Sequence, residues 1–469
     1  MCAVKLTYPG VYVDEVSILP PSIAEVESAV PAFVGYTEKA IGPNGSLTMV
    51  PMKISNYSEY SLFFGNPPVE AADSITLKAV DDGAGDYVLT AIVDPTKQSK
   101  NVLANSIRHF YDNGGGDCYI VSVGGYKDPV DKDLTDGLAL VEQIDEVTLL
   151  SVPESQFCPT YSSVAQAMIK QASDTADRFA LLDPDTVTLK TSALPSGAIT
   201  TDTDLIKTAA IPVGKALSYA AAYYPNLITT YPLNVTLGSV KFSSDSAPDL
   251  KDDLVSTLGT SSALYKRVEA LSKTCYGFLP PSAAMAGLIA RVDATKGFWK
   301  APANESLASV ITPTVLLSDK EQGNLNIDST SGKSINVIRS FPGYGTLAWG
   351  ARTLDGNDNE WKYINVRRFF MVVEESIKKS IHWAVFEPNT ASTWVKVQAM
   401  IENYLFQKWR DGALAGAKPE QAYEVNVGLN KTMNSVDILE GRMIVEIKMA
   451  VSRPAEFIVL RFEQMMQTS

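Results

Sequence analysis

Carboxylates follow two apolar stretches in the first half of the chain and are the side chains best placed to do chemistry. Glu154 ends the stretch EVTLLSVPE, and Asp183 and Asp185 follow RFALL. A helix is predicted between the two stretches, and this strand–helix–strand order favours parallel strands. Ligands of parallel sheets bind beyond the carboxyl ends of the strands. Glu154, Asp183 and Asp185 are therefore the candidates for a carboxylate site.

Other residue types give little support for catalysis. The two histidines, His109 and His382, lie in different predicted helices, so neither a Ser-His-Asp arrangement nor a histidine metal site is indicated. The cysteines are scattered without a CxxC pair, which argues against a zinc site or a disulfide framework. They are Cys2, Cys118, Cys158 and Cys275. An enzyme is disfavoured, and we expect no catalytic residue, no metal and no cofactor.

Two glycine motifs resemble nucleotide-binding loops but lack the required context. The triple glycine at 114–116 follows a predicted helix and precedes a strand, which is the reverse of the phosphate-loop order. Gly343, Gly345 and Ala348 satisfy GxGxxA, but strand-like residues surround them and no helix begins there. We interpret the first motif as a tight turn and the second as weak evidence for a dinucleotide.

Length and composition indicate a soluble protein of several domains. With 469 residues, 45% of them hydrophobic and 20% charged, the chain is expected to form two to four domains. No run of 18 apolar residues occurs, and the first ten residues lack a signal-peptide core, so synthesis and retention in the cytoplasm are expected. The net charge of −13 argues against a nucleic-acid partner. Residues 351–469 are neutral, so the acidic charge lies in residues 1–350.

Two long amphipathic helices are predicted between residues 338 and 412. Apolar residues recur at spacings of three and four in each, which places them on one face. They are Val366, Phe369, Phe370, Val373, Ile377 and Ile381 in the first helix, and Trp394, Val397, Ile401, Tyr404 and Leu405 in the second. Pro388 separates the helices, Asn389 or Thr390 can cap the second, and Gly412 is placed to end it. This pair is expected to form a packing core that also presents a surface to a neighbour.

Strands are predicted at both ends of the chain. Val11, Tyr12 and Val13 form one, and 424–427, 442–451 and 457–464 form others. No hairpin partner lies near the first strand, so its backbone must pair elsewhere. A sheet of its own chain and a sheet of another subunit both remain open at this point.

Several segments together resemble a known family. They are TYPGVYVDEV, AGLIARVDATKGFWKAPAN, GYGTLAWGARTL followed by WKYINVRRFFMVVEESIKKSIHWAVFEPN, and WVKVQAMIENYLFQKWRDGALAGA with the closing strands. In these segments, which cover over half of the chain in the family's order, the sequence resembles the tail sheath proteins of contractile phages, R-type bacteriocins and related phage-like injection particles. PAFVGYTEKA and NGGGDCYIVSV also look like this family.

The resemblance implies a structural subunit that polymerises as stacked sixfold rings around an inner tube. It implies contraction on a baseplate signal, which drives the tube through a target envelope without a nucleotide. The implied partners are further copies of the chain, the inner tube protein, and baseplate and terminal cap proteins, with no nucleic acid and no direct membrane insertion. After synthesis, the subunit would belong to a phage tail or an injection particle, released on lysis or held in the cell.

The implied fold is a multidomain α+β or α/β protein. An inner domain of N- and C-terminal segments would hold helices and a mixed sheet that is completed by strands from neighbouring subunits. An outer α/β domain would carry an inserted loop-rich domain. The expected parts are an N-terminal exchange arm and linker (1–24), a middle and outer α/β domain (25–66, 101–185 and 261–345), variable insertions (67–100 and 186–260), an inner tube-facing domain (346–451) and a C-terminal exchange arm (452–469).

The same resemblance assigns roles to the terminal segments. Strand exchange between subunits would use Val11, Tyr12, Val13, Phe457, Ile458, Val459 and Leu460. Flexible hinges would contain Pro20, Pro21 and Pro454. We propose Lys396, Lys408 and Arg410 on the second helix as tube contacts, and the alternative is an ordinary solvated helix face.

Two other classes of function remain as alternatives. One is an α/β enzyme with a carboxylate site near Glu154 and Asp183, and the other is a static structural polymer such as a tube or surface-layer subunit. The sequence does not distinguish a phage from a bacteriocin or an extracellular particle.

Overall fold

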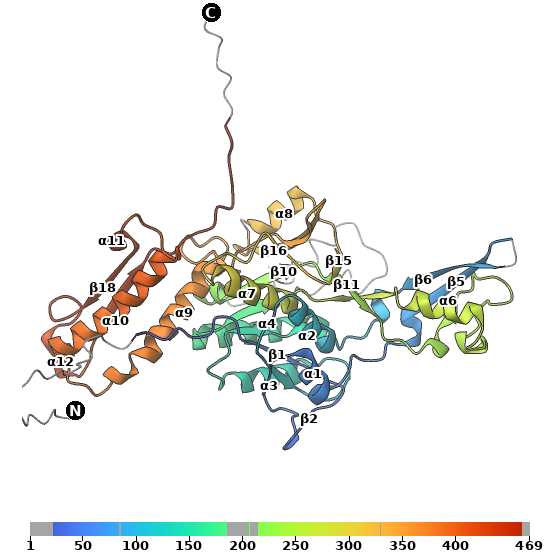
Figure 1. Cartoon of the computed structure of the whole chain (residues 1–469), viewed down its shortest axis with the longest axis horizontal. Helices are drawn as coiled ribbons and strands as arrows, with labels where there is room; N and C mark the ends of the chain where they lie inside the picture. Colours follow the sequence, from blue (N-terminus) through green and yellow to red (C-terminus); the bar gives the residue numbers. More distant parts are fainter. Residues whose placement is uncertain (1–21, 84–85, 185–205, 207–213, 329, 462–469) are drawn as a thin grey trace, which may run out of the picture. The chain divides into compact units, whose positions relative to one another are not determined.

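A computed structural model describes residues 22–83, 86–184, 206, 214–328 and 330–461 (Figure 1). The predicted strand Val11–Val13, together with Pro20, Pro21 and Asp185, lies outside these residues. The chain divides into two compact units. The larger unit comprises Glu27–Met371 and the residues from Arg453 onward, and the smaller unit comprises the residues up to Val26 and Val372–Ser452. Each unit is described separately.

A nine-stranded mixed sheet forms the centre of the larger unit. Its order is β14 (Glu305–Ser306), β17 (Gly345–Ala348), β16 (Ile335–Phe341), β10 (Ala220–Tyr224), β9 (Phe179–Leu182), β8 (Leu149–Ser151), β1 (Pro31–Gly35), β7 (Cys118–Ser122) and β4 (Met52–Ile54). The strands from β16 to β7 are parallel, and the strands beyond them at both edges are antiparallel. The predicted parallel pairing of β8 with β9 is confirmed.

Helices cover both faces of this sheet, and the strand sequences show why. The residues of β1, β9 and β10 are all buried, as expected for parallel strands that contact apolar side chains on both faces. On one face, α3 (Asp131–Val141) and α4 (Tyr161–Thr175) pack against residues such as Val34 and Leu150. On the other face, α2 (Leu103–Asp112) and α7 (Ser282–Lys296) pack against residues such as Phe33 and Phe179. The core therefore consists of two apolar layers separated by the sheet.

The two predicted insertions contribute to one small sheet. Hairpin strands β5 (Ile75–Asp81) and β6 (Tyr87–Val93) come from the first insertion, and β12 (Lys241–Phe242) from the second pairs with β5. The helix α6 (Ala263–Ser272) contributes Val268 to the same core. Residues 220–224 differ from the expectation, because β10 is a central strand of the main sheet and not part of an outer insertion.

The remaining elements of the larger unit are short. They are β2 (Ile41–Gly42), β3 (Gly45–Ser46), α1 (Tyr57–Phe64), α8 (Asp319–Asn326), and a three-stranded sheet of β13 (Tyr276–Leu279), β11 (Leu227–Pro232) and β15 (Val310–Pro313). Together with the main sheet, they make this a mixed α/β protein with one large sheet and several small ones.

The smaller unit contains the two predicted amphipathic helices. They are α9 (Ile364–Ser380), whose first residues belong to the larger unit, and α10 (Ala391–Arg410). Thr390 occupies the N-cap position, and Gly412 follows the helix with a φ of 85°, which favours glycine. Val397, Ile401, Tyr404 and Leu405 are buried as predicted. The helix pair is confirmed.

A two-stranded antiparallel sheet completes the smaller unit. It consists of β18 (Tyr423–Val427) and β19 (Val445–Met449), with the short helices α11 (Pro419–Ala422) and α12 (Ser435–Leu439) beside it in sequence. Among the described residues, no further strand pairs with either β18 or β19. Both strands therefore present an unpaired outer edge, which is a template for another chain.

Candidate subunit-interaction site

Of the three carboxylates predicted to form a site, Glu154 and Asp183 lie among the described residues, and both cap helices inside the larger unit. Glu154 is fully buried, and its oxygens accept hydrogen bonds from the backbone N–H groups of Tyr36 at 2.8 Å and Leu103 at 3.3 Å, the latter at the start of α2. Burial raises the pKa of Glu154 to about 8, although these backbone donors lower it. Its position explains the side chain in structural terms, because its oxygens accept from backbone N–H groups, one of which has no partner within α2.

Asp183 plays the same part at α7. Its carboxylate accepts a 2.8 Å hydrogen bond from the backbone N–H of Ser282 and a 2.5 Å bond from the Ser282 hydroxyl. Burial raises the pKa of Asp183 to about 7, and the Ser282 bonds lower it. Asp183 and Glu154 are each almost completely withdrawn from solvent, so neither is accessible to a substrate.

The other motifs are also structural. His109 is buried, with Nε2 3.0 Å from the carbonyl of Ala308, and burial lowers its pKa to about 4. The triple glycine forms the predicted turn between α2 and β7, and Gly343 and Gly345 lie in the β16–β17 hairpin. In the described parts of the chain, no group of three His, Cys, Asp or Glu side chains could hold a metal ion.

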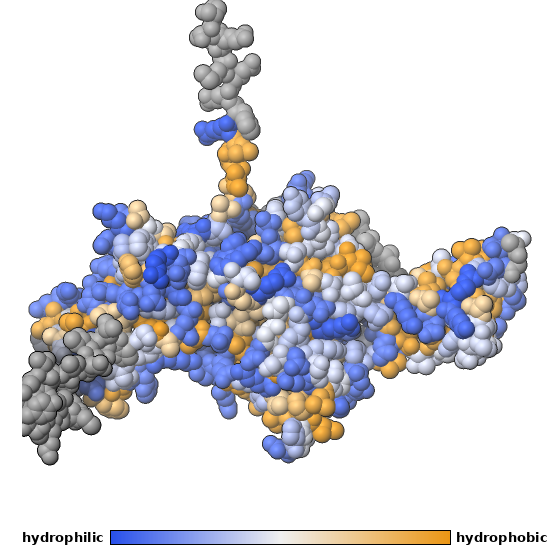
Figure 2. Space-filling view, in the orientation of Figure 1, coloured by the Kyte–Doolittle hydropathy of each residue, from blue (hydrophilic) through white to orange (hydrophobic). Residues whose placement is uncertain are grey.

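The C-terminal arm, defined here as residues 457–461, exposes a run of apolar side chains. Phe457, Ile458, Val459 and Leu460 have relative exposures of 68%, 80%, 79% and 72%. Figure 2 shows this end of the chain as hydrophobic surface. Of the predicted strand at 457–464, the described residues 457–461 have no strand partner in the part of the chain that the structure describes. Monomeric soluble proteins rarely expose four consecutive apolar side chains, so we interpret this run as a segment that contacts another chain.

The arm begins directly after an anchored carboxylate, that of Glu456. Arg352 donates from Nε to Glu456 Oε1 at 2.9 Å and from Nη2 to Oε2 at 2.6 Å. Asn326 Nδ2 donates to Oε1 at 2.8 Å, and the Tyr363 hydroxyl donates to Oε2 at 3.3 Å. The side chains of Arg352 and Glu456 are only 6% and 22% exposed. Burial raises the pKa of Glu456, but the hydrogen bonds from Arg352 and Asn326 outweigh it and leave the pKa below its ordinary value.

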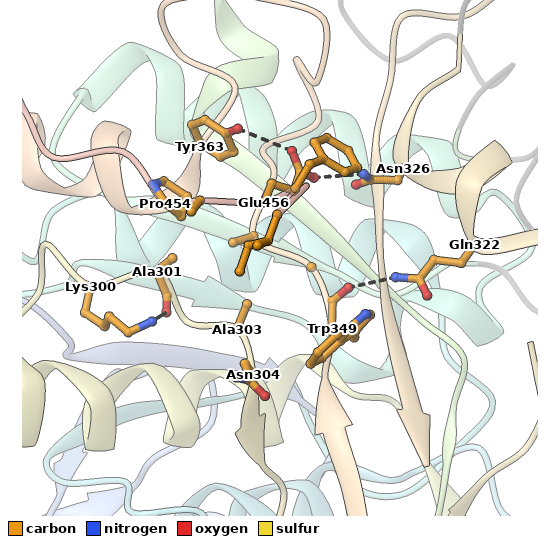
Figure 3. Close-up of a pocket in the computed structure, with 15 residues that line it drawn as sticks. Lys300, Ala301, Ala303, Asn304, Gln322, Asn326, Trp349, Tyr363, Pro454 and Glu456 are labelled. Atoms are coloured by element: carbon orange, nitrogen blue, oxygen red, sulfur yellow. Dashed lines mark hydrogen bonds between the residues drawn. The ribbon is translucent and has the colours of Figure 1, made fainter. Parts of the chain in front are cut away.

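An open pocket of about 480 Å³ lies beside this anchor. Figure 3 shows Glu456 between Tyr363 and Asn326, with Trp349, Ala303 and Lys300 lining the pocket. Phe457 and Ile458 also line it, so the first apolar residues of the arm border the pocket. Sequence reasoning missed Glu456, although it is the one charged residue between Pro454 and the apolar run.

In the smaller unit, the first described residues of the chain lie along the two helices. The backbone N–H groups of Ala24 and Val26 each donate to a serine hydroxyl of α9, those of Ser380 and Ser376, at 3.1 Å. The Glu25 carboxylate accepts a 2.9 Å hydrogen bond from the Tyr404 hydroxyl and forms an ion pair with Lys408. These contacts fix the point at which the N-terminal segment enters the unit.

The three proposed tube contacts on α10 are not equivalent. Lys396 and Arg410 are exposed, whereas the Lys408 side chain is only 12% exposed and its ammonium lies near Glu25 and the Tyr404 ring. Lys408 therefore packs within the unit, and Lys396 and Arg410 are the exposed members of the proposed tube contact. The exposed surface of α10 also includes Val395 and Phe406.

Comparisons with known sequences all match tail sheath proteins. A family model described as the phage tail sheath C-terminal domain matches residues 356–465. The tail sheath protein of Enterobacteria phage T4 is 25% identical over 186 residues, which are 39% of this chain and 27% of that protein. A putative prophage major tail sheath protein of Pseudomonas aeruginosa is 32% identical over 120 residues, which are 25% of this chain and 30% of that protein. These matches span less than a third of each relative.

Solved structures match almost the whole chain. The helical sheath of the anti-feeding prophage in its contracted state is 29% identical, with a TM-score of 0.64 over 98% of this chain and 99% of that chain. The contracted sheath of the extracellular contractile injection system PVC is also 29% identical, with a TM-score of 0.63 over 98% of both chains. The chain is a contractile tail sheath protein. As a sheath subunit, it is a structural, non-enzymatic component of a phage tail or contractile injection particle.

The sheath assignment explains the chemistry of the described residues. Unpaired strand edges and an exposed apolar arm are features of a subunit that binds other subunits, whereas the buried carboxylates stabilise the subunit itself. Among the described residues, no helix has the length and hydropathy required to cross a membrane.

Proposed function

We propose that this sheath protein polymerises as stacked sixfold rings around an inner tube and contracts to drive the tube through a target envelope. The main observation in support of this proposal is the exposed apolar arm that follows Glu456. The solved structures similar to this chain include contracted sheaths and a baseplate, which supports a subunit with partners of its own kind and at a baseplate. A terminal cap protein completes the proposed set of partners.

Strand exchange is the proposed means of polymerisation. The outer edges of β18 and β19 are unpaired in the described chain, and Phe457–Leu460 is an unpaired apolar segment. Adding a strand to an open edge gives main-chain hydrogen bonds that are directional and strong. We assign the arm of one subunit, and Val11–Val13 of another, to the two open edges of a third.

The smaller unit is proposed as the inner domain, which faces the tube. It holds the open sheet and the exposed surface of α10 with Lys396 and Arg410. The hinges proposed at Pro20, Pro21 and Pro454 would let subunits repack while the exchanged strands stay paired. The larger unit, with its insertion sheet, would then form the outer part.

Electron microscopy of the native particle tests the proposal. We expect one long, narrow tubular state before treatment with mild denaturant and one short, wide state after it. A polymer of one fixed length under all conditions would instead support the alternative of a static tube or surface-layer subunit. A protein that stays monomeric with its tube present would contradict both.

A further inference from the structure

We infer that Glu456 is a positioning residue that fixes where the C-terminal arm leaves the subunit. The inference rests on the proposed function for its effect on assembly, but the anchor itself belongs to the larger unit alone. The chain leaves the smaller unit at Ser452, and only Arg453, Pro454 and Ala455 separate it from Glu456. Pro454 is therefore the second residue of the larger unit after this boundary, and the free part of the arm begins at Phe457.

Three separate elements converge on this carboxylate. Asn326 is the last residue of α8, Arg352 follows β17, and Tyr363 directly precedes α9. Together they donate four hydrogen bonds to the two oxygens of Glu456. The bidentate arginine pair fixes direction as well as distance, because both N–H groups must lie in the carboxylate plane.

Arg352 is held in place independently of Glu456. Its Nη1 donates to the carbonyl of Gly356 at 3.2 Å, and its backbone N–H donates to Asn336 Oδ1 at 2.8 Å. The groups that bind Glu456 are therefore preorganised, and the carboxylate binds to them with little rearrangement.

The arm beyond Glu456 has no comparable restraint. Within the described chain, residues 457–461 lie in no strand or helix, and four of their side chains are largely exposed. The pocket bordered by Phe457, Trp349 and Ala303 offers an apolar surface of the same subunit against which an unrestrained arm would pack. Glu456 holds the root of the arm so that these residues stay available to another copy of the chain.

Spin labels test whether the anchor orders the arm. One label is placed at the exposed Ala455, next to the anchored Glu456, and one at the exposed Lys320 of α8, each through cysteine, in a chain with Cys2→Ser. Cys118, Cys158 and Cys275 are buried and stay unlabelled. In the free subunit, we expect a narrow distribution of distances between the labels. Glu456→Gln should abolish the narrow component, because a neutral amide cannot accept both Arg352 bonds.

Two further variants make the result decisive. Glu269→Gln, which breaks an exposed ion pair between Glu269 of α6 and Lys273 in the larger unit, is the matched control and should keep the narrow component. Asn326→Ala removes one donor and leaves Arg352, so it should broaden the distribution even if Glu456→Gln fails to fold. An unchanged distribution in Asn326→Ala and in folded Glu456→Gln would overturn the anchor.

An assembly assay of the same variants distinguishes a failure of this inference from a failure of the proposed function. We expect Glu456→Gln to lose incorporation into sheaths, whereas Glu269→Gln retains it. If Glu456→Gln loses the narrow component but assembles normally, the positioning role is wrong while the sheath function stands. If the wild-type chain fails to assemble on its tube, the proposed function is wrong, whatever the labels show.

Discussion

Arg368 of α9 donates two hydrogen bonds to the carboxylate of Asp293 on α7, at 3.0 Å to Oδ1 and 2.6 Å to Oδ2. The two side chains are 2% and 6% exposed. Arg368 also donates to the carbonyl of Ser28 at 2.8 Å, and the Ser28 hydroxyl donates to Asp293 at 2.6 Å. One ion pair therefore joins the start of α9, the end of α7 and the segment before β1.

Removing the Asp293 carboxylate should leave the positive charge of Arg368 buried with no opposite charge beside it. We expect Asp293→Ala to lower the free energy of unfolding by about 3–5 kcal/mol, measured by urea denaturation. Glu269→Ala is the matched control, because Glu269 and Lys273 form an exposed pair one helical turn apart. That control should change stability by less than about 1 kcal/mol. Equal effects of the two variants would contradict a special role for the buried pair.

Close packing of α2 against α7 depends on Gly287. A Cβ atom at this position would collide with the backbone carbonyl oxygen of Phe110, which cannot move without shifting α2. We expect Gly287→Ala to lower the free energy of unfolding by about 1–3 kcal/mol, measured by urea denaturation.

A second glycine provides the control for this variant. Gly323 lies in α8, and a Cβ atom there meets nothing within 4 Å. Gly323→Ala should therefore stabilise the protein by about 0.5–1 kcal/mol, since alanine loses less backbone freedom in a helix. Stabilisation by both substitutions to the same extent would show that helix propensity, and not packing, controls the first.

Asp183 should make stability depend on pH. Its pKa is raised from 3.8 to about 7, so between these values the folded protein holds a proton that the unfolded chain has released. Stability must then fall as pH rises through this range, by up to about 1.4 kcal/mol per pH unit. Asp183→Asn should flatten the fall, because an amide can keep the bond from the Ser282 backbone without titrating. Parallel curves for wild type and variant, from urea denaturation at several pH values, would contradict this.

The sequence predicted elements whose pattern is local. The amphipathic period of α9 and α10 and the glycine after α10 were sufficient to predict both helices and the end of the second. The place of strand β10 in the main sheet was missed, because AAAYY has no alternation and follows a segment rich in Ser and Thr. Its burial comes from neighbours β9 and β16, which are remote in sequence.

The roles of charged residues could not be predicted in the same way. Glu154 and Asp183 were correctly placed at strand ends, but spacing does not show that each faces the N-terminus of a helix from another part of the chain. Glu456 pairs with a residue 104 positions away. Such pairs form only in the folded chain. The sequence alone therefore does not show whether a charged side chain contacts solvent, the N–H groups at a helix start or an opposite charge.

The basic residues of α10 should separate into two groups when their charge is reversed. Lys408→Glu places a second carboxylate beside Glu25 and should lower the free energy of unfolding by about 1–3 kcal/mol. Lys396→Glu and Arg410→Glu change exposed positions and should leave unfolding unchanged within about 0.5 kcal/mol. If α10 faces the tube as proposed, these two variants should still weaken binding of the sheath to its tube, because they reverse charge at the contact. Cosedimentation with purified tubes measures this effect, and normal binding by both variants would leave α10 a solvated helix face.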